Sequence, residues 1–578
     1  MLTLRPIAAV CIALTATVFA GPLGAQTSPA GGHVHYAEPS AQQASPTGAL
    51  APRLQNLGSH TFPVSTRNRQ AQQFMNQGLN LAYAFNHAEA RRAFREAARL
   101  DPNLAMAYWG QALVLGPNIN ALMEPNEEPQ AYELAQKARS LKSRAGAREQ
   151  AYIDALAQRY SGTAPDRAAR DTAYADAMRA LHQRYPQDPD AAMLYVESVM
   201  DLRPWGYFQR DGTPHAGTAE IVSLTEQVMA KHPRHPAALH MYIHLMEGTG
   251  TPEKAERAAD TLLTLMPAAG HMVHMPGHIY QRVGRYADAM RSNELAIAAD
   301  EDYIAQCRAQ GLYPMGYYPH NIHFLWFAAT FDGQSRVAIE SARKLAAKID
   351  EETLKVAPML AGFRVVPYYA LTRFGRWEEM LREPEPPAFS AVLRATWHYA
   401  RGLALVATGR LDAAAAELMS LRGLMSDESM KQPLFSPNLA GSVLAPAPEV
   451  LQGEIAAARG DYESAIAHLD RAIRLEDSLV YTEPSEFHYP PRHALGAVLL
   501  EAGRPAEAET VYWEDLRRNQ ENGWALFGLL QALRAQNKMA DAALVEARFA
   551  KAWARSDVTL TASRFGRPSR TGQATLSR

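Results

Sequence analysis

Apolar residues recur at helical spacing along most of the chain, and the pattern breaks at polar turns about every 34 residues. The first unit reads QGLNLAYAFNHAEARRAFREAARLDPN (77–103). Later breaks carry a glycine followed by a polar or aromatic residue, at VGRYADA (283–289), FGRWEEM (374–380), TGRLDAA (408–414), RGDYESA (459–465) and AGRPAEA (502–508). The pattern predicts an all-α chain built from successive helix pairs over roughly residues 70 to 555.

Small and bulky residues of the first unit fall at the packing positions of a known repeat. These residues are Gly78, Ala90, Phe94, Ala97 and Pro102. The chain therefore resembles the tetratricopeptide superfamily. The resemblance implies helix pairs stacked into a right-handed superhelix, an α-solenoid, whose concave groove is lined mainly by the first helix of each pair. Two segments, HMPGHIY (274–280) and EDLRRNQENGW (514–524), also resemble a group of secreted, bacterial-type repeat proteins.

The two ends of the chain differ from the repeats in composition. Arg5 followed by an apolar run over 7–20 and small residues predicts a signal peptide over 1–25, and hence a periplasmic or secreted protein without a membrane span after cleavage. We expect a flexible leader over 26–66, repeats over 67–202, a histidine-rich block with insertions over 203–350, further repeats over 351–555 and a disordered tail over 556–578.

Charge and cysteine content exclude several classes of function. The chain has 58 Lys and Arg against 60 Asp and Glu, a net charge of −2, so no basic excess points to nucleic acid. Cys11 and Cys307 are the two cysteines, too few for a cysteine-ligated metal cluster or a disulfide scaffold. Sequence motifs for phosphate loops, dinucleotide binding, a nucleophile elbow, HExxH zinc sites and CxxCH haem attachment are missing.

Histidines concentrate in the middle of the chain and keep a fixed register. Nine of the 19 lie between His232 and His323, where uniform scattering would place about three. Counting back from the turn glycines of three successive repeats gives the same offsets each time. Ten residues back stand His240, His274 and His323; six back stand His244 and His278; thirteen back stand His271 and His320.

These offsets place the histidines on shared helix faces. Residues three or four positions apart lie on one face of a helix, which groups His240 with His244 and Glu247. In the tetratricopeptide family these registers face the groove, so the resemblance places all seven imidazoles on its lining. Pro276 disturbs the simple pattern, because it predicts either a helix start near Met275 or a kink between His274 and His278.

Clustered imidazoles are the commonest ligands of transition metals. The sequence therefore predicts a site for one or two ions, with the ligands His240, His244, His271, His274, His278, His320 and His323, and with Glu247 as a ligand or acid/base group. Copper is slightly favoured, because Met241, Met272 and Met275 lie in the same helices; zinc and iron fit as well. His235 is a marginal further candidate.

Three functions stay open at this point. The first is a metal-dependent enzyme that acts on a small organic or peptide substrate in the groove, by oxidation with copper or iron or by hydrolysis with zinc. The second is a scaffold that binds peptides or proteins, with the histidines as polar lining. The third is metal storage or delivery. Reaction type, substrate and oligomeric state do not follow from the sequence.

Overall fold

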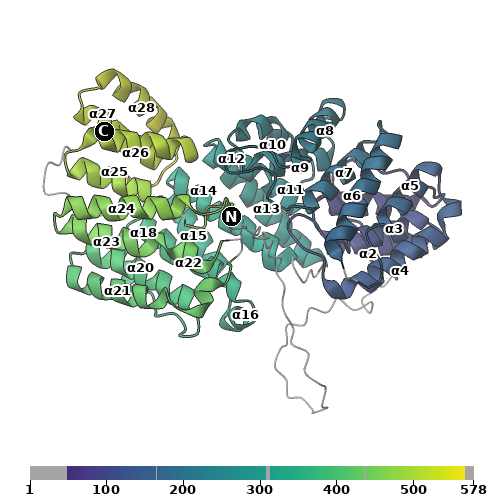
Figure 1. The fold of residues 1–578 in the computed structure, drawn as a ribbon, viewed down its shortest axis with the longest axis horizontal. Helices are drawn as coiled ribbons and strands as arrows, with labels where there is room; N and C mark the ends of the chain where they lie inside the picture. Colours follow the sequence, from purple (N-terminus) through teal and green to yellow (C-terminus); the bar gives the residue numbers. More distant parts are fainter. Residues whose placement is uncertain (1–47, 164–165, 308–312, 435–437, 488, 566–578) are drawn as a thin grey trace, which may run out of the picture. The chain divides into compact units, whose positions relative to one another are not determined.

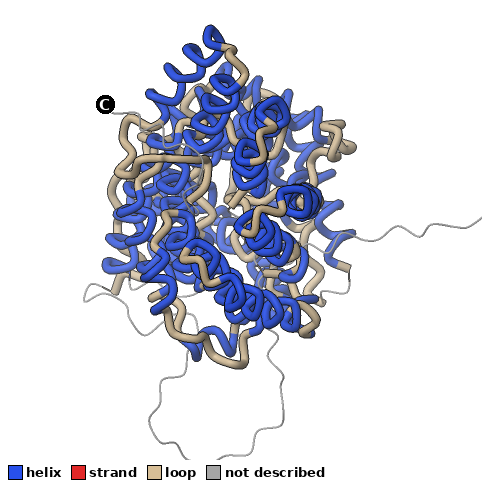
Figure 2. Tube along the Cα trace, turned by 90° about the vertical axis from the view of Figure 1, so that its left-hand side faces the viewer, coloured by secondary structure: helices blue, strands red, loops and turns tan. Residues whose placement is uncertain are grey.

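The described residues of the chain form helices joined by loops and turns. A computed structural model describes residues 48–163, 166–307, 313–434, 438–487 and 489–565. Within these ranges, β-type pairing is limited to three isolated bridges, as between Phe208 and Pro214. Figure 2 shows helices joined by loops and turns throughout this part of the chain. The predicted all-α fold is confirmed. The predicted signal peptide lies outside the described residues.

The chain divides into two compact units, which we describe separately. The N-terminal unit holds the described residues up to Ile279 together with Glu294–Tyr318, and the C-terminal unit holds Tyr280–Asn293 and the described residues from Pro319 onward. The predicted block boundaries at 202 and 350 therefore fall inside units rather than between them. Along the sequence, the boundaries of the two units fall within α12 (Pro276–Arg282), within α13 (Tyr286–Cys307) and at the start of α14 (Tyr318–Asp332).

The remaining α-helices follow in chain order (Figure 1). Those of the N-terminal unit are α1 (Arg69–Tyr83), α2 (His87–Leu100), α3 (Ala105–Leu113), α4 (Glu128–Ser140), α5 (Ala147–Leu156), α6 (Arg167–Arg184), α7 (Pro189–Asp201), α8 (Thr218–Lys231), α9 (Pro236–Met246), α10 (Glu256–Leu262) and α11 (Gly270–His274). Those of the C-terminal unit are α15 (Ser335–Ala346), α16 (Glu351–Val356), α17 (Ala361–Arg364), α18 (Val366–Arg373), α19 (Trp377–Arg382), α20 (Ala391–Ala407), α21 (Leu411–Leu424), α22 (Ala440–Leu444), α23 (Pro446–Ala458), α24 (Tyr462–Asp477), α25 (Pro491–Glu501), α26 (Pro505–Arg518), α27 (Gly523–Ala535) and α28 (Met539–Ala552).

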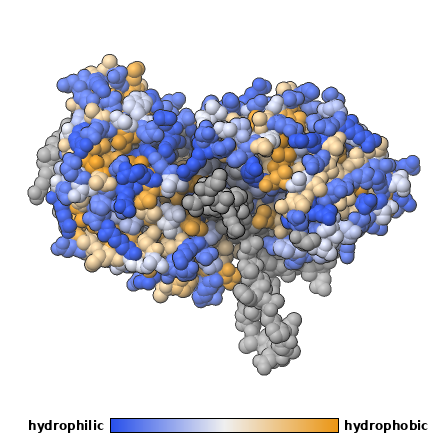
Figure 3. All heavy atoms as spheres, in the orientation of Figure 1, coloured by the Kyte–Doolittle hydropathy of each residue, from blue (hydrophilic) through white to orange (hydrophobic). Residues whose placement is uncertain are grey.

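Short helical turns complete the list. They are η1 (Pro125–Glu127), η2 (Lys142–Arg144), η3 (Pro252–Ala255), η5 (Pro358–Leu360) and η6 (Glu428–Lys431), with a π-helical turn η4 (Tyr313–Tyr317). On the face drawn in Figure 3, hydrophilic residues cover much of the helix surfaces. Among the helices that the structure describes, none has both the length and the apolar run that a bilayer crossing requires.

Glycines let neighbouring helices close on a large side chain, which explains the stacked pairs. Phe94 on α2 is fully buried between Gly78 on α1 and Gly110 on α3. A Cβ atom at Gly78 would lie 2.5 Å from the Phe94 ring, and one at Gly110 2.6 Å from it. The five turn glycines singled out in the sequence all adopt the left-handed backbone that glycine tolerates best, at φ values from 65° to 82°. The tetratricopeptide-like pairing is thus confirmed.

Part of the predicted flexible leader is packed rather than loose. Within the described residues 48–66, Phe62 is 0% exposed and lies between the rings of Trp109 and Tyr152, at centroid distances of 5.8 and 5.5 Å. The backbone N–H of Ser65 donates to Glu149 at 2.5 Å. Low-complexity composition predicted flexibility here, but one buried aromatic side chain anchors the segment on α3 and α5. Residues 26–47 lie outside the described part of the chain.

The predicted disordered tail is corrected in the same way. Ser563 is fully buried, and its hydroxyl donates to the carbonyl oxygen of His493 at 2.6 Å. Arg564 forms ion pairs with Glu454 and Glu501. These contacts hold Ser563 and Arg564, near the end of the described tail, on α23 and α25 of the C-terminal unit. The rest of the predicted tail, 566–578, lies outside the described residues.

Candidate metal centre

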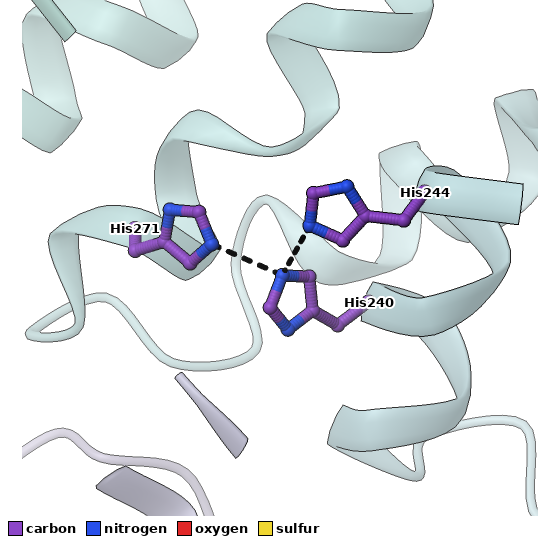
Figure 4. Close-up of side chains that lie close together, drawn as sticks. All are labelled: His240, His244 and His271. Carbon is purple, nitrogen blue, oxygen red and sulfur yellow. Dashed lines mark hydrogen bonds between the residues drawn. The ribbon is translucent and has the colours of Figure 1, made fainter. Parts of the chain in front are cut away.

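Three predicted ligands converge inside the N-terminal unit. His240 and His244 lie one turn apart on α9, and His271 lies on α11. Their Nε2 atoms point at one another in Figure 4. The Nε2 atom of His240 lies 3.1 Å from that of His244 and 3.1 Å from that of His271. The three side chains are buried, with exposed fractions of 0% for His240 and 2% for the other two.

Hydrogen bonds at Nδ1 fix the tautomers of His240 and His244. Nδ1 of His240 lies 2.7 Å from the carbonyl oxygen of Tyr83, which can only accept, so this nitrogen carries the hydrogen. Nδ1 of His244 likewise donates to Oε1 of Glu247 at 2.8 Å. In the neutral rings, both Nε2 atoms therefore present bare lone pairs to each other. The contact between these two atoms, drawn as a dashed line in Figure 4, is a hydrogen bond only if one ring is protonated, and that would bury a positive charge.

His271 completes the group from the opposite side. Its backbone N–H donates to the hydroxyl of Tyr313 at 3.1 Å, and this hydroxyl in turn donates to Asp300 at 3.0 Å. The ring of Tyr317 lies against the imidazole at a centroid distance of 4.8 Å. Nδ1 of His271 is buried without a hydrogen-bond partner among the described residues. Nothing in these contacts fixes the tautomer of His271, so its Nε2 can present a lone pair to a shared cation.

A second histidine pair lies next to the first group. Nε2 of His274, at the end of α11, lies 2.7 Å from Nε2 of His278 on α12. Pro276 begins α12, so the helix-start alternative predicted for this proline is the one the structure adopts. The carboxylate of Glu247 contacts a histidine of each group. Its Oε1 accepts from Nδ1 of His244, and its Oε2 lies 2.6 Å from Nδ1 of His278. Glu247 thereby orients one imidazole of each group.

Burial dominates the electrostatics of this region. It lowers the pKa values of His240 and His271 well below the ordinary value of 6.5, and neighbouring imidazoles lower them further. Burial also lowers the pKa of His278, against the opposing effect of Glu247. For Glu247 itself, burial acts to raise the pKa, but the contacts with His278 and His244 outweigh it and lower the pKa overall. The neutral form is therefore favoured for His240, His271 and His278, and the ionised form for Glu247.

The two remaining predicted ligands belong to the C-terminal unit. His320 lies on α14 with its ring 5.4 Å from that of Phe324. His323 stacks on Trp326 at 5.1 Å and meets Phe363 edge-on at 5.3 Å, and burial lowers its pKa to about 3. The convergence of all seven histidines in one groove stays a prediction, as does the role of Glu247 as a ligand or acid/base group.

The sequence analysis did not identify two aromatic residues that lie beside the histidines. Phe85 packs its ring 4.6 Å from that of His240 and 5.5 Å from that of His271, and Trp205 meets His244 at 5.2 Å. Both residues have positive backbone φ angles, 55° for Phe85 and 62° for Trp205, which residues other than glycine rarely adopt. Such backbone persists where the surrounding contacts impose it, often at functional sites. No sequence signal marks Phe85, which lies in a turn far along the chain from His240, whereas Trp205 falls in the block where insertions were predicted, although its contact with His244 was not.

Comparisons with known proteins show a fold likeness alone. No protein-family model and no curated protein matches the sequence. Solved structures with a similar arrangement include a human IFIT1 dimer with m7Gppp-AAAA, at 11% identity over 84% of this chain and 91% of that chain, with a TM-score of 0.29. The Cut9–Hcn1 heterotetramer of the APC/C matches at 11% identity, over 85% and 95%, with a TM-score of 0.28. The P58(IPK) TPR domain matches at 12% identity, over 81% and 99%, with a TM-score of 0.23.

Proposed function

We propose that the N-terminal unit is a metal-binding helical scaffold in which Nε2 of His240, His244 and His271 hold one transition-metal ion. The observation that carries the proposal is that Nε2 of His240 and Nε2 of His244 lie 3.1 Å apart in a buried site, while the Nδ1 atom of each ring faces an acceptor. Two imidazoles on one tetrahedral ion, at metal–nitrogen distances of about 2.0–2.1 Å, have their nitrogens about 3.3 Å apart. The observed spacing fits a shared cation.

The surrounding residues support a metal centre rather than a general polar lining. A carbonyl oxygen and a carboxylate hold the outer nitrogens of two of the imidazoles, which is the usual way proteins orient metal-bound histidine. The Tyr83 carbonyl does this for His240, and Glu247 does it for His244. In this proposal Glu247 is a positioning residue for the ligands of one ion, and the His274–His278 pair is the candidate for a second.

The finer proposal is a metal-dependent enzyme exported to the periplasm or beyond. Three protein ligands leave a fourth coordination position of a tetrahedral ion for water or substrate. A bound ion would supply Lewis-acid chemistry if it is zinc, or redox chemistry if it is copper or iron. Imidazole donors accept all three metals, and Met241, Met272 and Met275, which raised copper in the sequence analysis, are buried core residues. The alternatives are metal storage or delivery and a scaffold that binds peptides or proteins.

Metal titration tests the proposal directly. We expect the purified, chelator-treated protein to bind one equivalent of Co²⁺ tightly, with the intense visible absorption of a four-coordinate site, and to release it to Zn²⁺. Elemental analysis of the untreated protein then identifies the native metal. Weak binding of Co²⁺, Cu²⁺ and Zn²⁺ alike, with no change in the visible spectrum, would contradict a metal centre and favour the peptide-binding scaffold.

Replacement of Glu247 separates positioning from catalysis. Glu247→Ala removes the acceptor of two Nδ1–H groups, and we expect metal affinity to fall by about 10–100-fold, the usual cost of losing such a partner. The metal affinity of Glu247→Gln is expected to lie between those of the wild type and Glu247→Ala. Its amide oxygen still accepts from one imidazole, but its NH₂ group faces the N–H of the other. Competition with a chromophoric chelator measures both affinities. Unchanged affinity with loss of turnover would instead identify Glu247 as an acid/base group.

A further inference from the structure

A cavity of about 1010 Å³ opens in the N-terminal unit, among residues that the metal proposal does not use. Three chain segments and one side chain of α5, Arg148, form it; the segments are the packed leader around His60, the turn before α7 and the turn before α9. The volume is large enough for a small organic molecule.

The lining carries more positive than negative charge. Four cationic side chains and two carboxylates contribute to it. Arg148 is already paired with Asp188, at 2.5 Å between Nε and Oδ2. Arg184, Lys231 and Arg234 are exposed and form no ion pair with the described residues. Three uncompensated cations around one cavity favour an anionic ligand.

The buried end of the cavity holds a carboxylate with three donors. Oδ1 of Asp190 lies 2.8 Å from Nε2 of His60, 3.3 Å from Nε2 of His235 and 2.7 Å from the hydroxyl of Tyr83. Nδ1 of His235 accepts from the N–H of Ala238 at 3.3 Å, so its hydrogen is on Nε2. By composition His60, Asp190 and His235 could hold a cation. Each contact, however, already joins a donor to an acceptor, unlike the facing lone pairs of His240 and His244.

His60 is left with one acceptor. Its Nε2 donates to Asp190, so Nδ1 carries the lone pair of the neutral ring. Nδ1 has no hydrogen-bond partner among the described residues, and 16% of the side chain is exposed. The cavity therefore combines exposed cations with a hydrogen-bond acceptor, Nδ1 of His60, whose ring a buried carboxylate holds in place.

We propose that this cavity binds a phosphate group, held by Arg184, Lys231 and Arg234, with a hydroxyl of the ligand donating to Nδ1 of His60. Inorganic phosphate supplies both features, because it is anionic and keeps a P–OH donor near neutral pH. Sulfate matches its shape and charge but has no hydrogen to donate, and carboxylates also lack one. The volume exceeds that of a single phosphate, so a phosphomonoester with a neighbouring hydroxyl fits as well. None of the residues that line the cavity belongs to the proposed metal centre, although Tyr83 bonds a residue of each.

Calorimetric titration at constant ionic strength tests the proposal with the full chain. We expect inorganic phosphate to bind saturably at millimolar concentration or below, and sulfate to bind at least about tenfold more weakly, because it leaves the His60 acceptor unused. Titration with glycerol phosphate distinguishes free phosphate from a phosphomonoester as the preferred ligand. Absence of saturable binding by both phosphates overturns the proposal, and equal affinity for sulfate overturns the part played by His60.

Two variants locate the binding. The double variant Arg184→Gln/Arg234→Gln is expected to weaken phosphate binding about tenfold or more. A matched control, Arg139→Gln/Arg170→Gln, removes the same charge from exposed positions of the same unit that do not line the cavity, and should change affinity by less than about twofold. Equal weakening in both would show that only the general charge of the unit attracts the anion. His60→Ala should abolish the preference for phosphate over sulfate.

Discussion

Replacing His240 and His271 together by alanine is expected to abolish stoichiometric metal binding. His240 is the central ligand of the trio, since its Nε2 lies 3.1 Å from both neighbours, and His271 brings the only nitrogen from α11. The loss in affinity should exceed the about 100-fold that removal of an orienting partner costs, because direct bonds to the ion disappear. Metal content by elemental analysis and the Co²⁺ spectrum measure the effect.

A histidine outside the cluster provides a control for the double substitution. His182 lies on α6 of the same unit, where its ring stacks on Tyr195 away from the cluster. His182→Ala should leave the metal stoichiometry unchanged. Far-ultraviolet circular dichroism shows whether the double variant still folds, which we expect because the substitutions also remove unfavourable lone-pair contacts. A double variant that folds and still binds one equivalent at wild-type affinity would refute the His240–His271 site.

Filling the glycines around Tyr512 is expected to have the largest effect on stability. The Tyr512 ring on α26 is fully buried between Gly496 on α25 and Gly528 on α27, and its hydroxyl bonds Ser563 at 2.7 Å. A Cβ atom would lie 2.3 Å from the ring at Gly496 and 2.1 Å from it at Gly528. Held from both sides and at its tip, the ring cannot move away. Each Gly→Ala change should lower the free energy of unfolding by about 1–3 kcal/mol or more.

Urea denaturation of the variants measures this effect, with an open glycine as the control. Gly423 lies near the end of α21, is exposed, and would place a Cβ atom in empty space. Gly423→Ala should be neutral or stabilise the protein by up to about 1 kcal/mol, because glycine is entropically costly in a helix. A Gly528→Ala protein as stable as Gly423→Ala would show that the tyrosine does not set the helix spacing.

Helical registers of the candidate site were predictable from sequence, since they depend on neighbours three or four positions apart. His240 and His244 share a face of α9 as predicted, and Pro276 divides His274 from His278 by starting a new helix. The tautomers were not predictable, because Tyr83, which fixes that of His240, lies 157 positions away along the chain. The contacts of Phe85 and Trp205 with the histidines were missed for the same reason.

The predictions of a flexible leader and a disordered tail, made from local composition, were wrong for the described residues near the two ends of the chain. Residues 48–66 and 556–565 are poor in regular apolar patterns, yet Phe62 and Ser563 are fully buried. One well-placed side chain suffices to anchor an extended segment when the repeat surface offers a matching site, and composition averages over such single contacts. This anchoring also places His60 beside Asp190 and so completes the cavity, which no sequence motif predicted.

The sequence by itself determined the helix pairs, their turns and the faces on which the histidines lie, because these depend on helical periodicity and on glycine and proline within each repeat. Only the tertiary structure decided which imidazoles meet, which nitrogen of each ring carries its hydrogen, and how the N-terminal segment closes a charged cavity. Those features depend on distances between residues that are remote in sequence, and close packing of the folded chain fixes them.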